Sequence, residues 1–287
     1  MIQFPPCKIN LGLSILAKRS DGFHELETVF YPVALHDIVE IVPSATTNNI
    51  QQAATTITSK ASREVSFSHS GISIPGEATH NLCVKAYDLI KADFPKLPPV
   101  SIHLHKNIPM GAGLGGGSSD GVSVLTLLNT LFELKLTKVQ LLQYAATLGS
   151  DCPFFIFNEA CHATGRGEIL NPIPINLSNY TIALVHPGIH IATPWAFQQL
   201  TPCKKEKSIS AIIKEPIETW KKNLLNDFEK PVFHAHPLLE NIKNNLYEQG
   251  AIYASMSGSG SSLFGIFPKG MPIQSPSIGN AYRMDVI

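Results

Sequence analysis

The sequence predicts an α+β protein of two lobes that divide near residue 160. Three observations support this. Apolar and polar side chains alternate in the first forty residues, a glycine-rich segment follows a predicted strand and precedes a predicted helix, and the second half lacks the regular strand–helix unit of a doubly wound sheet. The chain has 287 residues, of which 44% are hydrophobic, so it can bury a substantial core.

The first forty residues are predicted to form strands. Residues 8–15 and 37–41 alternate apolar and polar side chains, and a polar turn at residues 18–24 lies between them. Residues 44–70 are rich in Thr, Ser, Ala and Gln and contain few large apolar side chains. Because such a segment buries little, we expect loops and an exposed hairpin there.

The middle of the chain alternates helices and one strand. Residues 79–90 have helical spacing, residues 99–108 read as a strand, and the apolar stripe of residues 122–132 predicts a second helix. Thr137 to Gln140 form a capping-box sequence, which opens a helix ending at Gly149. Further along, we expect a strand at residues 180–185 and helices around residues 209–225 and 237–249.

Charge and cysteine usage exclude several classes of protein. Lys and Arg number 22, as do Asp and Glu, so general binding of nucleic acid or of an anionic membrane has no electrostatic support. The N-terminus lacks a signal-peptide pattern and no apolar segment reaches the length of a membrane span without polar interruption, so we expect a cytoplasmic protein.

The five cysteines are scattered along the sequence, which suits reduced residues that pack in the core. His103 and His105 share a strand face without an apparent third ligand, so no metal site is predicted.

Residues 109–120, PMGAGLGGGSSD, carry the strongest chemical signal. Glycines let backbone amides approach an oxygen-rich ligand, and the start of a helix adds unpaired N–H donors and a partial positive charge. The segment therefore suits a phosphate group. Ser118 and Ser119 have hydroxyls that either cap the helix or reach the Mg²⁺ that accompanies ATP, and the sequence leaves both roles open.

Other interpretations of this segment fit less well. Gly111, Gly113 and Gly116 match the dinucleotide-binding pattern, but 108 residues precede the segment and the acidic Glu133 lies in a helical pattern. Ser118 stands where a Walker loop has lysine. A glycine-rich turn without a ligand would lose backbone entropy for no gain.

The segment resembles the phosphate-binding signature of the GHMP kinases, which include galactokinase, homoserine kinase and mevalonate kinase. A second segment, SMSGSGSSLFGIF at residues 255–267, resembles the C-terminal motif of these kinases. The resemblance implies ATP as phosphoryl donor with Mg²⁺, and an active site in a cleft between an N-terminal lobe of residues 1–160 and a C-terminal lobe of residues 161–287. It implies ATP contacts at Asn81, Lys106, Pro109, Met110, Gly111, Ala112, Gly113, Leu114, Gly115, Gly116, Gly117, Ser118 and Ser119. A helix N-cap is the alternative role for Asn81, and a solvated side chain is the alternative for Lys106.

Several further segments are similar to one branch of these kinases. They include Lys8 and Asn10 in the first predicted strand, the DGFH sequence ending at His24, and the GSDCPFF sequence around Asp151. One residue of the DGFH sequence departs from the branch, because Phe23 stands where tyrosine is common. That branch phosphorylates 4-diphosphocytidyl-2-C-methyl-D-erythritol in non-mevalonate isoprenoid biosynthesis. The resemblance therefore implies an acceptor with a cytidine diphosphate moiety.

The resemblance also assigns roles within the site. It makes Asp151 the general base, whereas a helix N-cap is the alternative role for an aspartate before proline. It makes Lys8 a cation near the acceptor hydroxyl, with Asn10 on the same strand face, whereas a solvated lysine and a solvent-facing asparagine are the alternatives. The implied substrate contacts are Asn10, Phe23, His24, Thr193 and Phe197.

Two rival functions remain from the sequence. Another GHMP kinase would act on mevalonate, homoserine or a sugar, and a regulatory nucleotide-binding protein on the same fold would lack catalysis. The DGFH element argues against the first, and the presence of both Lys8 and Asp151 argues against the second. The sequence does not decide between a monomer and a homodimer.

Overall fold

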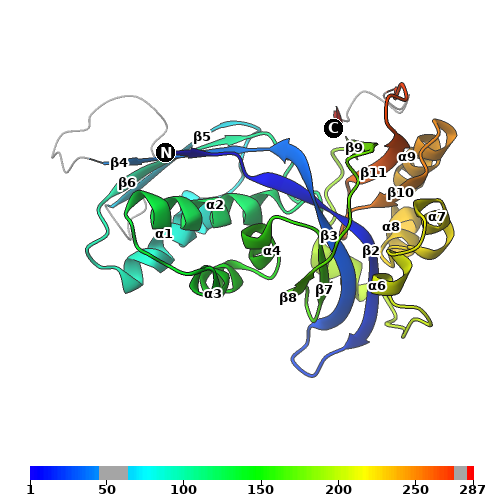
Figure 1. Ribbon diagram of the computed structural model, residues 1–287, viewed down its shortest axis with the longest axis horizontal. Helices are drawn as coiled ribbons and strands as arrows, with labels where there is room; N and C mark the ends of the chain where they lie inside the picture. The colour runs from blue at the N-terminus through cyan, green and yellow to red at the C-terminus, as the bar shows by residue number, and fades with distance from the viewer. Residues whose placement is uncertain (45–63, 275–282) are drawn as a thin grey trace. The chain divides into compact units, whose positions relative to one another are not determined.

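The computed structural model describes residues 1–44, 64–274 and 283–287. Its helices and strands confirm the α+β class (Figure 1). The α-helices are α1 (Leu82–Asp93), α2 (Gly116–Leu131), α3 (Lys138–Leu148), α4 (Cys152–Phe157), α5 (Thr193–Gln198), α6 (Ile209–Ile212), α7 (Trp220–Asn223), α8 (Glu229–Ala235) and α9 (Pro237–Glu248). The strands are β1 (Ile2–Gln3), β2 (Pro6–Lys18), β3 (His24–His36), β4 (Ile38–Pro43), β5 (Val65–Gly71), β6 (Val100–Lys106), β7 (Cys161–Thr164), β8 (Ile169–Pro172), β9 (Tyr180–His186), β10 (Tyr253–Met256), β11 (Leu263–Pro268) and β12 (Arg283–Val286).

The chain forms two compact units that interleave along the sequence. The first unit comprises Met1–Cys7, Leu35–Met110 and Gly115–Asn158, and the second comprises Lys8–Ala34, Gly111–Leu114 and Glu159–Ile287. The division of the chain into domains at residue 160 stays a prediction. The glycine-rich segment is divided, because its residues 111–114 belong to the second unit and the residues on either side belong to the first.

The first unit is a sheet covered by helices on one face. The strand order is β1-β4-β6-β5, with β5 and β6 parallel and the other pairs antiparallel. Along β6, Val100, Ile102 and Leu104 are buried whereas Ser101 and His105 are exposed. The helices α1 and α2 pack on each other and contact strands of this sheet (Figure 1). The strand β6 thus leads from a helix-covered core directly into the glycine-rich segment.

The local signals of the first unit are confirmed. Asn81 caps α1, because its Oδ1 accepts a hydrogen bond of 2.9 Å from the amide of Cys83. Thr137 and Gln140 form the reciprocal capping box that opens α3, and Gly149 ends that helix.

The prediction of loops and an exposed hairpin at residues 44–70 is wrong for residues 65–70, which belong to the strand β5. Val65 and Phe67 are buried and alternate with Ser66 and Ser68, and the strand pairs with β6. A strand at the edge of a sheet needs few large apolar side chains to pack on the core. The low apolar content of this segment therefore did not indicate a strand. Residues 45–63 lie outside the described residues.

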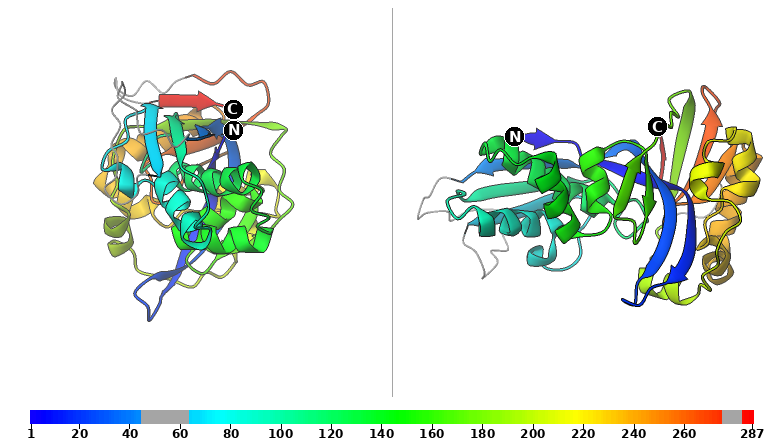
Figure 2. Two further views of the ribbon diagram at one scale, coloured as in Figure 1. Left: turned by 90° about the vertical axis from the view of Figure 1, so that its left-hand side faces the viewer. Right: turned by 60° about the horizontal axis from the view of Figure 1, so that its bottom comes forward.

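The second unit contains two four-stranded sheets. One has the order β2-β3-β7-β8, and its strands β2 and β3 form a long bent hairpin, blue in Figures 1 and 2. The other has the order β10-β11-β9-β12. The helices α8 and α9 cover this second sheet through a core that includes Phe233, Leu239, Leu246 and Phe267. The second glycine-rich segment lies wholly in this unit, and residues 111–114 of the first segment belong to it as well.

The helix expected around residues 209–225 is broken into short pieces. The helix α6 is followed by a 3₁₀ turn, Ile217–Thr219, and then by α7. Pro216 immediately precedes the turn, and a proline has no N–H with which to continue a helical hydrogen-bond pattern from α6. Across the described residues, no helix combines the length and the apolar character that a membrane span needs.

Candidate active site

The first unit supplies the helical half of the glycine-rich segment. Gly115 precedes α2 with φ 70°, a left-handed conformation that favours glycine. A β-carbon on Gly116 would lie 2.9 Å from the Nζ atom of Lys106, whereas one on Gly117 would meet no atom within 4 Å. Gly116 is therefore needed for packing, and the exposed Gly117 leaves its backbone open to a ligand.

A cavity of about 490 Å³ lies beside this helix start, within the first unit. Its volume is in the range of small-molecule binding sites. Apolar side chains such as Phe67, Ile74 and Leu104 alternate in its wall with polar ones. The predicted ATP contacts Asn81, Lys106, Met110 and Gly117 all line it.

Lys106 lies in a buried cluster with two aspartates. Its Nζ atom pairs with Asp37 Oδ2, and with Asp120 Oδ2 at 2.8 Å, and the side chain is 1% exposed. The alternative of a solvated lysine is therefore wrong. The second oxygen of Asp37 accepts hydrogen bonds from the amides of Asn107 and Ile108 at 2.5 and 2.7 Å. The cluster thus fixes the backbone where β6 turns toward the glycines.

Burial controls the protonation of this cluster. Burial raises the pKa of Asp120 to about 8, even though the nearby Lys106 opposes the shift. For Lys106, burial lowers the pKa, but the attraction of Asp120 and Asp37 outweighs it and the pKa is raised. Asp120 Oδ1 and the hydroxyl of Ser119 are buried without a hydrogen-bond partner among the described residues.

Asp151 is half-buried at the N-cap position of α4. Its side chain makes no capping hydrogen bond to that helix, so the alternative capping role is wrong for the side chain. Cys152 and Pro153 follow in the first turn and are buried. They anchor the backbone that carries this carboxylate.

In the second unit, Lys8 is held against the glycine-rich segment. Its Nζ atom donates to Asn10 Oδ1 at 2.7 Å and to the carbonyl of Gly113 at 2.9 Å, and it lies 5.1 Å from the ring centroid of Phe30. Lys8 and Asn10 are 3% and 2% exposed, so the solvent-facing alternatives are wrong for both. Asn10 Nδ2 donates to the Thr28 hydroxyl at 3.0 Å, which fixes the orientation of the amide.

The predicted substrate contacts of the second unit form a partly aromatic group. The rings of His24 and Phe197 are stacked with centroids 4.8 Å apart. The Phe23 ring is exposed and lies 4.8 Å from the guanidinium carbon of Arg166. Thr193, near Phe197 in α5, shares a hydrogen bond of 3.1 Å with Ser259 of the second glycine-rich segment.

Sequence reasoning missed some residues of these groups. The sequence places Asp37 at the start of a predicted strand and Asp120 at the end of the glycine-rich segment. Their pairing with Lys106 joins residues that lie 69 and 14 positions from it along the chain. Arg166 lies between two glycines, Gly165 and Gly167, and that pattern was the signal available for it. Each pairing is long-range, which local patterns do not encode.

The chain matches two family models. The model for the N-terminal domain of GHMP kinases matches residues 81–159, and the model for their C-terminal domain matches residues 208–274. Together with the glycine-rich helix start and the buried lysine beside it, these matches establish the class of protein. The chain belongs to the GHMP kinases.

Its similar relatives define the branch. The 4-diphosphocytidyl-2-C-methyl-D-erythritol kinase of Bacteroides thetaiotaomicron is 50% identical over 94% of this chain and 93% of its own length. The kinase of the same name from Cytophaga hutchinsonii is 47% identical over 93% of this chain and 92% of its own length. Within the GHMP kinases, the chain therefore belongs to the family of 4-diphosphocytidyl-2-C-methyl-D-erythritol kinases.

Solved structures agree with this membership. A crystal structure of 4-(cytidine 5'-diphospho)-2C-methyl-D-erythritol kinase has a TM-score of 0.76 and 31% identity, covering 93% of this chain and 90% of its own. The mevalonate kinase of Methanococcus jannaschii has a TM-score of 0.67 at 13% identity, covering 94% and 92%. The second similarity concerns the fold alone.

Proposed function

We propose that this protein transfers a phosphoryl group from ATP to a hydroxyl of 4-diphosphocytidyl-2-C-methyl-D-erythritol, a step of non-mevalonate isoprenoid precursor biosynthesis. The structural observation that carries the proposal is the contact of the Lys8 ammonium with the Gly113 carbonyl. It holds a buried cation at the glycine-rich segment whose composition suits phosphate. The names of the similar relatives support the choice of acceptor.

Phosphoryl transfer needs positioning and charge stabilisation more than covalent help from the protein. In this proposal, the hydroxyl oxygen of the acceptor attacks the γ-phosphorus of ATP, and the bond from that phosphorus to ADP breaks. Asp151 accepts the proton that the hydroxyl loses. Lys8 stabilises negative charge at the reacting oxygens. An ammonium has three N–H donors and takes its fixed direction here from Asn10 and Gly113.

The residues of the first unit fit the nucleotide. The cavity beside α2 suits an adenine base in volume, and its lining includes Asn81 and Lys106. Because Lys106 Nζ is engaged by two carboxylates, we assign its adenine contact to the backbone or the alkyl chain. Gly117 offers an open backbone to the phosphates.

Mg²⁺ is part of this proposal as the ion that accompanies ATP. The buried hydroxyl of Ser119 at the start of α2, which has no hydrogen-bond partner in the part of the chain that the structure describes, is suited to be an oxygen ligand, and Ser118 precedes it. When bound, Mg²⁺ neutralises charge on the phosphates. The two serines would hold it beside the open backbone of Gly117.

The acceptor is recognised through its cytosine and its sugar alcohol. We assign hydrogen bonding of the base to His24 and stacking to Phe23 and Phe197, and we assign the remaining contacts to Asn10 and Thr193. The stacking of His24 on Phe197 supports a site for a flat ring, because aromatic faces already gather there.

An assay of ADP release over a panel of acceptors tests the function. The panel contains 4-diphosphocytidyl-2-C-methyl-D-erythritol, mevalonate, homoserine and galactose, each with ATP and Mg²⁺. We expect turnover with the cytidine diphosphate substrate alone. Turnover with one of the others would assign the chain a different GHMP activity, and binding of ATP without turnover of any acceptor would favour a regulatory protein.

A further inference from the structure

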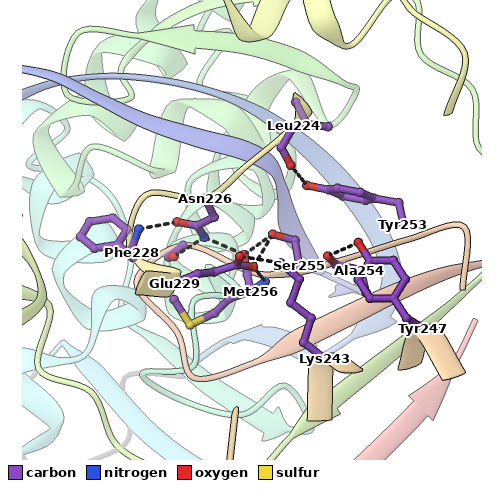
Figure 3. A network of polar contacts seen from close by, with 11 residues as sticks. Leu224, Asn226, Phe228, Glu229, Lys243, Tyr247, Tyr253, Ala254, Ser255 and Met256 are labelled. Atoms are coloured by element: carbon purple, nitrogen blue, oxygen red, sulfur yellow. Dashed lines mark hydrogen bonds and ion pairs between the residues drawn. The ribbon is translucent and has the colours of Figure 1, made fainter. Parts of the chain in front are cut away.

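A buried asparagine holds the second glycine-rich segment on both sides of Ser257. Asn226 Nδ2 donates to the carbonyls of Met256 and Gly258 at 2.7 and 2.9 Å, and its Oδ1 accepts from the amide of Phe228 at 3.0 Å (Figure 3). A primary amide has two N–H donors and one carbonyl acceptor, so this environment suits asparagine. The single side chain of Asn226 therefore holds the backbone of residues 256–258 through these two hydrogen bonds.

Glu229 holds the residues just before Ser257. Its Oε1 accepts hydrogen bonds of 2.9 Å from the Ser255 hydroxyl and from the amide of Met256, and its Oε2 pairs with Lys243 at 2.6 Å (Figure 3). The lysine offsets the cost of burying the carboxylate. Ser257 therefore follows a strand end that has little freedom to move.

The hydroxyl of Ser257 lies between the two oxygen atoms that hold Lys8. Ser257 Oγ donates to the Gly113 carbonyl at 2.8 Å and lies 3.4 Å from Asn10 Oδ1. The same two oxygens accept hydrogen bonds from Lys8 Nζ. Ser257 is fully buried, and all of these residues belong to the second unit.

The backbones of the two glycine-rich segments are also in close contact here. A β-carbon on Gly113 would overlap the carbonyl of Ser257, and one on Gly258 would lie 3.4 Å from the Cα atom of Gly113. The amide of Ser262 donates to the Ala112 carbonyl at 3.1 Å. A displacement of Ser257 would therefore shift Gly113, which is a direct partner of Lys8.

We propose that Ser257 is a positioning residue for the reaction, because its hydroxyl fixes the Gly113 carbonyl that directs the Lys8 ammonium. The inference rests on the role given to Lys8 in the proposed function. Ser257 itself does not touch the reacting atoms. Its effect on the rate must therefore disappear when the Lys8 ammonium is absent.

A double-mutant cycle tests this coupling. We expect Ser257→Ala to lower kcat about 5- to 10-fold, with the KM of the acceptor within about twofold, since one buried hydrogen bond is lost. In the Lys8→Met background, measured under single-turnover conditions, the same change should alter the residual rate by less than about twofold. Ser257→Thr keeps the hydroxyl and should keep the rate within about twofold of the wild type.

The neighbouring Ser255 provides the matched control. Ser255→Ala also removes one buried serine hydroxyl, but the amide of Met256 still donates to Glu229 Oε1 and Asn226 still holds the carbonyls on both sides of Ser257, so kcat should stay within about twofold while Tm falls. Equal rate losses from Ser257→Ala in both backgrounds would overturn the positioning role while leaving the proposed function intact. A Lys8→Met variant as active as the wild type would instead overturn the role of Lys8, and this inference with it.

Discussion

The rings of His24 and Phe197 stack with their centroids 4.8 Å apart and their planes inclined by 19°. Because stacking barely distinguishes pyrimidines, we assign the selection of cytosine to hydrogen bonding by the histidine ring. The wild type should prefer the cytidine diphosphate substrate over its uridine analogue by up to about 10⁴-fold in kcat/KM, and His24→Ala should lose much of this preference.

Phe197→Leu is the contrasting variant for that test. It weakens stacking without removing a hydrogen bond, so it should raise the KM of both substrates and leave their ratio nearly unchanged. Steady-state kinetics with the two analogues measure both variants. Full discrimination by His24→Ala, or equal use of both substrates by the wild type, would rule out His24 as the group that selects the base.

Asp151→Asn should bind ATP normally but lower kcat by about 10²- to 10⁴-fold, the range for loss of a positioned acid–base group. The substitution keeps the shape of the side chain, and the side chain does not cap α4, so the fold should be retained. Asp93→Asn changes an exposed carboxylate of the same unit and should leave kcat unaltered. Near-normal turnover by Asp151→Asn would remove this residue from the mechanism.

Gly116 and Gly117 offer a paired test of the phosphate site. Gly117→Ala places a methyl group in open space, so Tm should stay constant or rise, while ATP affinity should fall by about tenfold or more because the backbone is blocked. Gly116→Ala would press against Lys106 and Ile108 and should lower Tm first. Calorimetric titration of ATP and thermal denaturation separate the effects, and unchanged ATP affinity in Gly117→Ala would make the segment structural.

Asp120 should make the stability of the protein fall as pH rises. Burial raises the pKa of Asp120 in the folded state to about 8, above its ordinary value of 3.8, so the folded state retains a proton that the unfolded state releases. Its stabilising effect is complete below pH 3.8 and is lost progressively as the pH rises through about 8.

Asp120→Asn removes this titration while keeping an oxygen for Lys106. Relative to this variant, the wild type should lose up to about 1.4 kcal/mol of unfolding free energy per pH unit between pH 5 and 7, and the difference should level off above pH 8. Urea denaturation at several pH values measures it. Parallel pH profiles for the two proteins would show that Asp120 is ionised throughout this range.

Local signals in the sequence predicted local structure well. The capping box at Thr137 and the helix end at Gly149 depend on residues within one or two turns, and both are present. The glycine-rich segment likewise marked the start of α2, because left-handed and closely packed backbone positions require glycine.

The environments of the two lysines required the structure. A period-two pattern places Lys8 on a strand face but does not say that the carbonyl of Gly113, more than a hundred residues away, accepts a hydrogen bond from its ammonium. The sequence is equally compatible with a solvated Lys106, whereas in the structure Asp37 and Asp120 pair with its ammonium. Such pairings depend on how strands and helices pack, and no spacing along one strand records them.

The assignment of residues 111–114 to the second unit limits how this kinase can be engineered. A chimera that joins residues 1–158 to the C-terminal half of a relative would carry Gly113 and Lys8 from one parent, and the residue at the position of Ser257, which also donates to the Gly113 carbonyl, from the other. Such a chimera should therefore be active only where the C-terminal donor keeps a hydroxyl at the position of Ser257 and a glycine at the position of Gly258. Both halves of the chain contribute contacts that hold the glycine-rich segment in place.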